Sequence, residues 1–280
     1  MEILCSVRDG LTNADREAVP VQWRQLPNGF ADTGVPLLPS DVSEMVAGKN
    51  VLVMVHGYNC DFQGTLDTYQ QVLSTQLRGT AYAHPAADVV IGFFWPGGDR
   101  SHDYFDARQR VDAIGRQFSG ILATLRTAGR VDINAHSLGC RLVLKALGQP
   151  GIATPVVDVS LAAAATPDNV LSPGTAWKLH FPVRSLIVLS SRNDIVLAGA
   201  YPVGEKLSTW ENFPTAMGLN GPIRFDQWAT QRPEVQTVDC SRVVYGHGKY
   251  RETDSVWSHI AKEASRSSPS FVRRQSLRLV

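Results

Sequence analysis

A serine stands between a short apolar run and an amphipathic run in the segment R-V-D-I-N-A-H-S-L-G-C-R-L-V-L-K-A-L, residues 130–147. The five residues from Ala135 to Gly139 nearly match the G-x-S-x-G sequence of serine nucleophiles, with alanine in place of the first glycine. That sequence needs small residues two positions before and after the serine, because the chain turns sharply there from a strand into a helix. The segment therefore predicts that Ser137 is a nucleophile; the alternative is a serine that only caps the helix.

An earlier segment, V-L-V-M-V-H-G-Y-N-C at residues 51–60, ends a predicted strand with a histidine, a glycine and a tyrosine. Its place before the serine suits a loop that stabilises an oxyanion. The backbone N–H groups of Tyr58 and Leu138 would converge on the developing negative charge, and losing one such donor typically costs about 3 kcal/mol of transition-state stabilisation. The alternative is that Gly57 only ends a strand and that His56 fills a polar site.

Four segments carry a resemblance to a known group of proteins: VLVMVHGYN, FFWPGGD, INAHSLGCRLVLKAL and YGHGKY. Together they resemble the α/β-hydrolase fold superfamily, and more narrowly a bacterial branch of these hydrolases of unknown function. The resemblance covers residues 50–260. It implies a Ser–acid–His triad in that chain order, on a mostly parallel, eight-stranded sheet.

The implied order places the acid after a strand that follows the serine, and the histidine later still. Asp194, directly after R-S-L-I-V-L-S-S, fits the acid, with Asp168 as the alternative; capping a following helix is the other role open to Asp194. His247 and His259 both come late enough in the chain. We favour His247 because it lies in the glycine-flanked loop Y-G-H-G-K-Y, whereas His259 lies in a stretch with helical spacing, and catalytic groups tend to occupy loops.

The elements that must position these residues alternate between strand and helix from residue 50 to 190. This alternation favours a parallel sheet with helices on both faces. Six core strands are predicted from residue 50 onward, and two more within residues 2–8 and 19–25. We therefore expect a three-layer α/β sandwich with a mostly parallel eight-stranded sheet, forming one α/β-hydrolase domain over residues 1–265.

A long segment of mixed character, residues 195–234, follows the candidate acid. Such a stretch indicates either a lid or cap over the site or a peripheral helix on the sheet edge. Trp210 and Met217 in this segment, together with Trp95, are candidates for an apolar substrate pocket, with ordinary core packing as their other role. The Ser- and Arg-rich residues 266–280 predict a flexible basic tail.

The composition excludes several other classes of protein. The chain has 280 residues, 44% hydrophobic and 19% charged, and its net charge of +1 gives no indication of nucleic-acid binding. We find no apolar run long enough to span a bilayer and no secretory signal. Four scattered cysteines indicate free thiols, so we expect a cytoplasmic protein. No metal-binding or nucleotide-binding motif appears, and we expect neither a metal nor an organic cofactor.

Together these features predict a serine hydrolase of the carboxylesterase or lipase type, acting on a small-molecule carboxylic ester or thioester. Ser137, His247 and Asp194 would form its triad, and the reaction would pass through an acyl-enzyme. Two alternatives remain open: an acyltransferase that uses the same triad, and a non-catalytic binding protein that has kept the fold. The sequence predicts neither the acyl chain length nor the oligomeric state.

Overall fold

The structure is a computed structural model. It describes residues 1–8, 20–31, 34–78, 87–98, 104–151, 153–175, 183–209 and 214–265. The predicted basic tail, residues 266–280, and the candidate pocket residue Trp210 lie outside the described residues.

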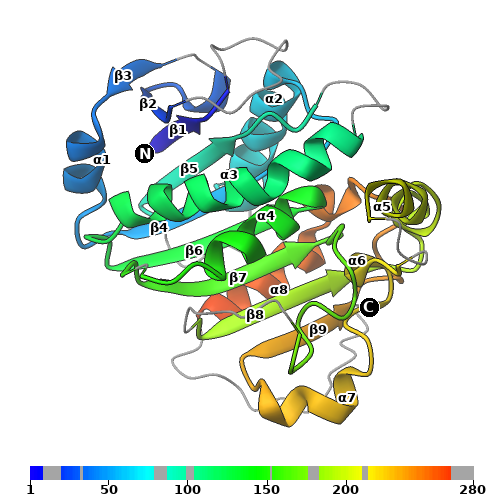
Figure 1. Cartoon of the computed structure of the whole chain (residues 1–280). Helices are drawn as coiled ribbons and strands as arrows, with labels where there is room; N and C mark the ends of the chain where they lie inside the picture. The colour runs from blue at the N-terminus through cyan, green and yellow to red at the C-terminus, as the bar shows by residue number, and fades with distance from the viewer. Residues whose placement is uncertain are drawn as a thin grey trace.

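A nine-stranded sheet forms the centre of the molecule, with the strand order β3-β2-β1-β5-β4-β6-β7-β8-β9 (Figure 1). Strand β2 is antiparallel to β1 and β3, and all other neighbouring pairs are parallel. The strands are β1 (Glu2–Ser6), β2 (Gln22–Leu26), β3 (Val35–Leu37), β4 (Asn50–Val55), β5 (Val89–Phe94), β6 (Arg130–His136), β7 (Val156–Ala162), β8 (Ser185–Ser190) and β9 (Val235–Asp239).

This architecture confirms the predicted α/β sandwich with a mostly parallel sheet, and it contains one strand more than the eight expected. The additional strand, β3, has three residues, includes Pro36 and pairs only with β2. Short length and proline are typical of edge strands, because the outer side of such a strand needs no ladder hydrogen bonds. A segment of this kind carries no alternation of apolar residues by which the sequence would reveal it.

Helices cover both faces of the sheet (Figure 1). Two successive residues of β5, which face opposite sides of the sheet, show this. A Cβ on Gly92 would meet the Tyr69 ring of α2, whereas the ring centroid of Phe93 lies 4.7 Å from that of Phe118 in α3. The helices are α1 (Pro39–Val46), α2 (Phe62–Val72), α3 (Tyr104–Thr124), α4 (Leu138–Leu147), α5 (Tyr201–Thr209), α6 (Met217–Asn220), α7 (Phe225–Trp228) and α8 (Asp254–Ala264). Among the residues described, none of these helices combines the length and apolar character needed to cross a bilayer.

The central strands are buried on both sides, which explains why they read as continuous apolar runs. All six residues of β5 and all six of β8 are buried. The parallel strands end at one edge of the sheet, and the candidate site residues come after β4, β6, β8 and β9. The sheet therefore delivers residues distant in sequence to a common edge.

The described part of the segment 195–234 consists of short helices joined by non-helical residues, and its first part lies over that edge (Figure 1). The π-helical turn η3 (Val196–Ala200) leads into α5, which is tied to α3 through the buried carboxylate of Glu205. That carboxylate accepts hydrogen bonds from Arg108 Nε at 2.6 Å and from the Tyr104 hydroxyl at 3.1 Å. These contacts hold α5 in place, and a role as a movable lid stays a prediction.

Candidate active site

Ser137 occupies a strained turn between β6 and α4. Its backbone has φ 54° and ψ −125°, a conformation that a residue with a side chain adopts only when its surroundings impose it. Three backbone hydrogen bonds impose it: Ser137 donates to Ala162, and its carbonyl accepts from Cys140 and Ala165. The serine is the residue before α4, yet its side chain makes no capping hydrogen bond, so helix capping does not explain it.

Small residues around Ser137 are required by close packing of α4 against β4. A Cβ on Gly139 would lie 2.3 Å from the carbonyl oxygen of His56, which is far closer than atoms approach. A Cβ on Gly57 would likewise lie 2.7 Å from the Cβ of Ser137. The glycine after the serine and the glycine after β4 thus allow the two loops to touch.

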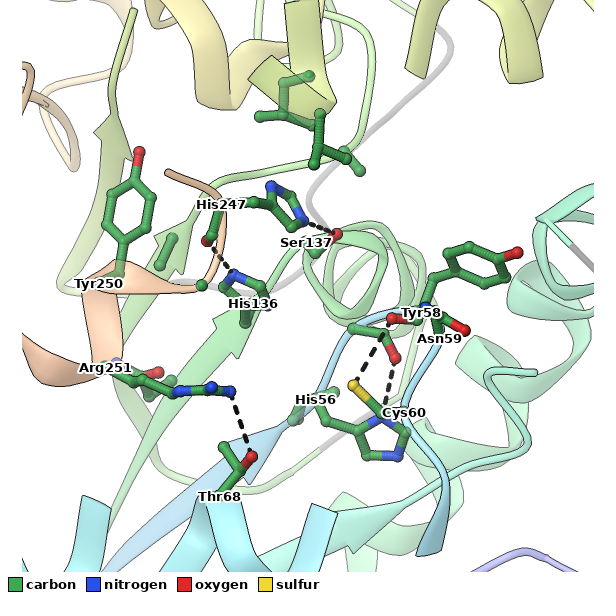
Figure 2. A pocket seen from close by; sticks show the side chains of 18 of the residues that line it. His56, Tyr58, Asn59, Cys60, Thr68, His136, Ser137, His247, Tyr250 and Arg251 are labelled. Atoms are coloured by element: carbon green, nitrogen blue, oxygen red, sulfur yellow. Dashed lines mark hydrogen bonds between the residues drawn. The ribbon is translucent and has the colours of Figure 1, made fainter. Parts of the chain in front are cut away.

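Three side chains predicted to act together do meet at this edge. The Nε2 atom of His247 lies 2.8 Å from the Ser137 Oγ (Figure 2). Its Nδ1 atom lies 2.8 Å from Oδ2 of Asp194. The serine is 6% exposed and the aspartate 0%. The arrangement is a continuous hydrogen-bonded chain from a buried carboxylate to a hydroxyl that lines a cavity.

Asp194 combines the two roles that its sequence position left open. Its Oδ2 faces the imidazole, while its Oδ1 accepts a hydrogen bond at 3.0 Å from the backbone N–H of Leu197 in the turn that follows. The alternative acid, Asp168, is half-buried and does not line the cavity. The alternative base, His259, is buried within α8 and does not line it either.

His136 has a structural connection that the sequence reasoning missed. It points away from the adjacent serine, and its Nε2 lies 2.8 Å from the backbone carbonyl of His247 (Figure 2). Burial, followed by the neighbouring His247, lowers the pKa of His136 from 6.5 to about 3. The ring is therefore neutral and donates its Nε2 proton to that carbonyl, which fixes the loop carrying His247.

His56 holds the opposite loop in a similar way. Burial lowers its pKa well below the ordinary value, so this ring is also neutral. The Trp95 backbone N–H donates to Nε2 at 3.1 Å, which leaves the proton on Nδ1, and Nδ1 lies 2.8 Å from the carbonyl of Gly57. Because a trans peptide directs its C=O and N–H to opposite sides, this bond also sets the direction of the Tyr58 N–H.

A cavity of about 890 Å³ opens at Ser137. Its walls are mostly apolar and come from two sides. The residues over the site are Tyr58, Tyr104, Val196, Leu197, Ala200, Tyr201 and Val203; those from α2, β4 and the α8 region are Met54, Tyr69, Val72, Val256, Trp257 and Ile260.

Two of the predicted pocket residues do not reach this cavity. Trp95 is fully buried and stacks on the His56 ring at 5.4 Å, with its indole N–H donating to the His56 carbonyl. Met217 is also fully buried, in α6 against β8. Both therefore belong to the core, the other role considered for them, and Tyr104 and Tyr201 supply aromatic wall instead.

Across the described ranges, no group of three or more His, Cys, Asp or Glu side chains is arranged to hold a metal ion.

Comparison with known proteins identifies a family. Residues 40–262 match the family model described as Alpha/beta hydrolase of unknown function (DUF900). An uncharacterized protein of Nostoc sp. is 26% identical over 124 residues, which cover 37% of this chain and 32% of that protein. The chain thus spans about a third of the length of this curated relative.

Two solved structures are similar at low sequence identity. One is a poly(3-hydroxybutyrate) depolymerase, LpqC, from Bordetella parapertussis, with a TM-score of 0.42 and 15% identity, covering 77% of this chain and 80% of that one. The other is a cutinase-like protein from Cryptococcus sp., with a TM-score of 0.35 and 12% identity, covering 79% of this chain and 94% of that one. The matched family region, residues 40–262, includes Ser137, Asp194 and His247.

Proposed function

The chain belongs to the family Alpha/beta hydrolase of unknown function (DUF900), and on that premise we propose that it is a serine hydrolase that cleaves a carboxylic ester or thioester. The observation that carries the proposal is the Asp194–His247–Ser137 chain, with both hydrogen bonds at 2.8 Å. A structural role alone would not require the serine to adopt a strained backbone at the wall of a cavity.

In the proposed first step, Ser137 Oγ attacks the carbonyl carbon while His247 Nε2 accepts the hydroxyl proton. A C–O bond forms, the carbonyl π electrons move onto its oxygen, and the imidazole becomes positively charged. Asp194 keeps the Nδ1 proton of His247 in place and stabilises that charge from a site closed to water. Its 0% exposure strengthens this interaction, because a low local dielectric reduces screening.

The oxyanion would be stabilised by the backbone N–H groups of Tyr58 and Leu138. Leu138 is the first residue of α4, where N–H groups have no partner within the helix and the helix dipole favours negative charge. The His56–Gly57 hydrogen bond sets the peptide plane that carries the Tyr58 N–H. The close approach of Gly57 to Ser137 supports the same placement.

Collapse of the oxyanion expels the alcohol or thiol, which takes the proton from His247 Nε2 and leaves an acyl-enzyme. Water then attacks the acyl carbon, His247 accepts its proton, and the carboxylic acid leaves as Ser137 regains its proton. The mostly apolar cavity supports an apolar chain on one side of the scissile bond.

The test is a panel of 4-nitrophenyl esters with acyl chains from acetate to laurate, assayed with the wild type and with Ser137→Ala. We expect Ser137-dependent hydrolysis with an optimum at a medium chain length, because the cavity is large and apolar. The partition of the acyl group between water and an added alcohol or amine tests the acyltransferase alternative, because an acyltransferase would transfer most of the acyl group to the added nucleophile. Folded wild-type protein that cleaves none of the esters or thioesters faster than Ser137→Ala would refute the proposal.

A further inference from the structure

One charged side chain, Arg251, lines the cavity in the described part of the chain. The lining residues include no aspartate, glutamate or lysine. Two of the three lining histidines, His56 and His136, are kept neutral because burial lowers their pKa values. A cation without an anion in the cavity wall favours a ligand that brings negative charge, because a charge next to apolar surface loses part of its solvation; the Glu252 carboxylate that pairs with Arg251 lies outside the lining.

Arg251 also retains hydrogen-bonding capacity. A guanidinium has five N–H donors. Within the described residues, the Arg251 guanidinium donates one hydrogen bond, from Nη1 to the Thr68 hydroxyl at 3.2 Å. Its Nε is buried and has no hydrogen-bond acceptor. The nearby Glu252 approaches Nε only to 3.7 Å and binds Lys249 Nζ more closely, at 2.6 Å.

The position of Arg251 links this charge to the nucleophile. Arg251 lies in η5 (Lys249–Glu252), four residues after His247, and Thr68 lies in α2. Figure 2 shows the Arg251 side chain extending toward Thr68, below His136 and His247 in this view. Both Arg251 and Ser137 line the same cavity, so a ligand held at the guanidinium extends toward the serine.

The field of Arg251 is felt by groups at the site. Its positive charge adds to the effects of burial and of His247 in lowering the pKa of His136. At Cys60, where burial raises the thiol pKa, the charges of Arg8 and Arg251 oppose that rise. The cavity wall formed by α2 and η5 therefore has positive potential, which favours a ligand with negative charge.

We propose that Arg251, supported by Thr68, selects esters that carry a carboxylate several atoms away from the scissile bond on an otherwise apolar chain. This inference rests on the proposed function, because it names the substrate class of the same site. A carboxylate matches the planar fork of a guanidinium and can accept two parallel N–H bonds from it. The mostly apolar cavity that both residues line accommodates the methylene chain that separates the charge from the reacting carbonyl.

The test compares esters matched in length and differing in one charge. On the acyl side, mono-4-nitrophenyl suberate carries the carboxylate and 4-nitrophenyl octanoate lacks it. On the alcohol side, the butyrate ester of 6-hydroxyhexanoic acid carries the carboxylate and hexyl butyrate lacks it. In at least one pair we expect wild-type kcat/KM to be about tenfold higher for the charged ester, as a charge-assisted hydrogen bond at a partly buried site provides.

Variants assign that preference to Arg251. Arg251→Met, which replaces the guanidinium by an unbranched apolar side chain, should bring the charged-to-neutral ratio of kcat/KM to about one, and Arg251→Lys should retain part of the preference through charge without the fork. Arg116→Met is the matched control, because Arg116 is exposed on α3 and does not line the cavity. A ratio near one in the wild type for both pairs, or a ratio that survives in Arg251→Met, overturns the inference.

Failure of the inference and failure of the proposed function give different results. Hydrolysis of the neutral esters without preference for the charged ones would refute the anion site and still support the serine hydrolase. If no ester is cleaved, titration of suberate by calorimetry still decides the anion site. Heat of binding in the wild type that disappears in Arg251→Met supports it, and no heat in the wild type refutes it.

Discussion

The Nδ1 atom of His247 lies 2.8 Å from a carboxylate oxygen of Asp194, a residue with no exposed surface. The two come from loops that follow β8 and β9, at neighbouring positions in the sheet. Because the carboxylate accepts the Nδ1 proton, the lone pair of the imidazole is presented at Nε2, where the Ser137 hydroxyl lies. The orientation of the proposed base is thus determined by a group that does not touch the nucleophile.

Replacing Asp194 by asparagine should lower kcat by about 10⁴-fold, because an amide can donate to Nδ1 and so stabilise the wrong tautomer. Asp168→Asn is the matched control, since Asp168 follows the preceding strand and lies away from the cavity. Initial rates of ester hydrolysis measure both. A fall in kcat of similar size in the control would reassign the acid.

Variants of His247 and His259 should give different results in the same assay. His247→Ala removes the proposed base and should lower kcat by about 10⁴-fold or more without unfolding the protein. His259 is buried in α8, so His259→Gln should change the melting temperature more than kcat. Turnover by His247→Ala close to that of the wild type would contradict the assignment.

Gly57→Ala should disturb the proposed oxyanion loop, because the new methyl group would lie 2.7 Å from the Ser137 Cβ. We expect kcat to fall by about 10²-fold, the typical cost of losing one oxyanion donor. Gly120→Ala is the control: nothing lies within 4 Å of its Cβ position in α3, and alanine should stabilise that helix by about 1 kcal/mol. Unchanged kcat in Gly57→Ala would argue against Tyr58 as a donor.

Acid should destabilise the protein in part through His136. Its pKa is lowered from 6.5 to about 3 in the folded chain, so between these values the unfolded chain binds more protons. The stabilisation is complete above pH 6.5 and is lost as the pH falls toward 3. We therefore expect His136→Asn to show a smaller drop in melting temperature than the wild type between about pH 7.5 and about pH 5. The pKa of His56 is also lowered by burial, and this residue is present in both proteins, so it contributes to both drops. Equal drops in melting temperature would refute the role of His136.

The core strands and the serine turn were predictable because their physical causes are local. Fully buried parallel strands have continuous apolar sequences, and a sharp strand-to-helix turn requires Gly139. These two features depend on a few neighbours along the chain. Asp194 and His247 were proposed from the chain order that the family resemblance implies, and they lie together because residues after parallel strands share one edge.

The remaining features depend on contacts between distant segments. The bond from His136 to the carbonyl of His247 joins residues 111 positions apart, and no local pattern marks it. Arg251 lies in the same loop region as His247, but its place in the cavity follows from the packing of η5 against α2. Trp95 was a candidate for the apolar pocket, with core packing as its other role, and only its contact with the distant His56 ring places its indole in the core.

The most direct measurement is active-site labelling with a fluorophosphonate, followed by intact-mass and peptide analysis. The account predicts a single phosphonyl group on Ser137 in the wild type, no labelling in Ser137→Ala, and strongly slowed labelling in His247→Ala, because the probe reacts with a serine that a neighbouring base has activated. Folded wild-type protein that remains unlabelled, or a label on any residue other than Ser137, would contradict it.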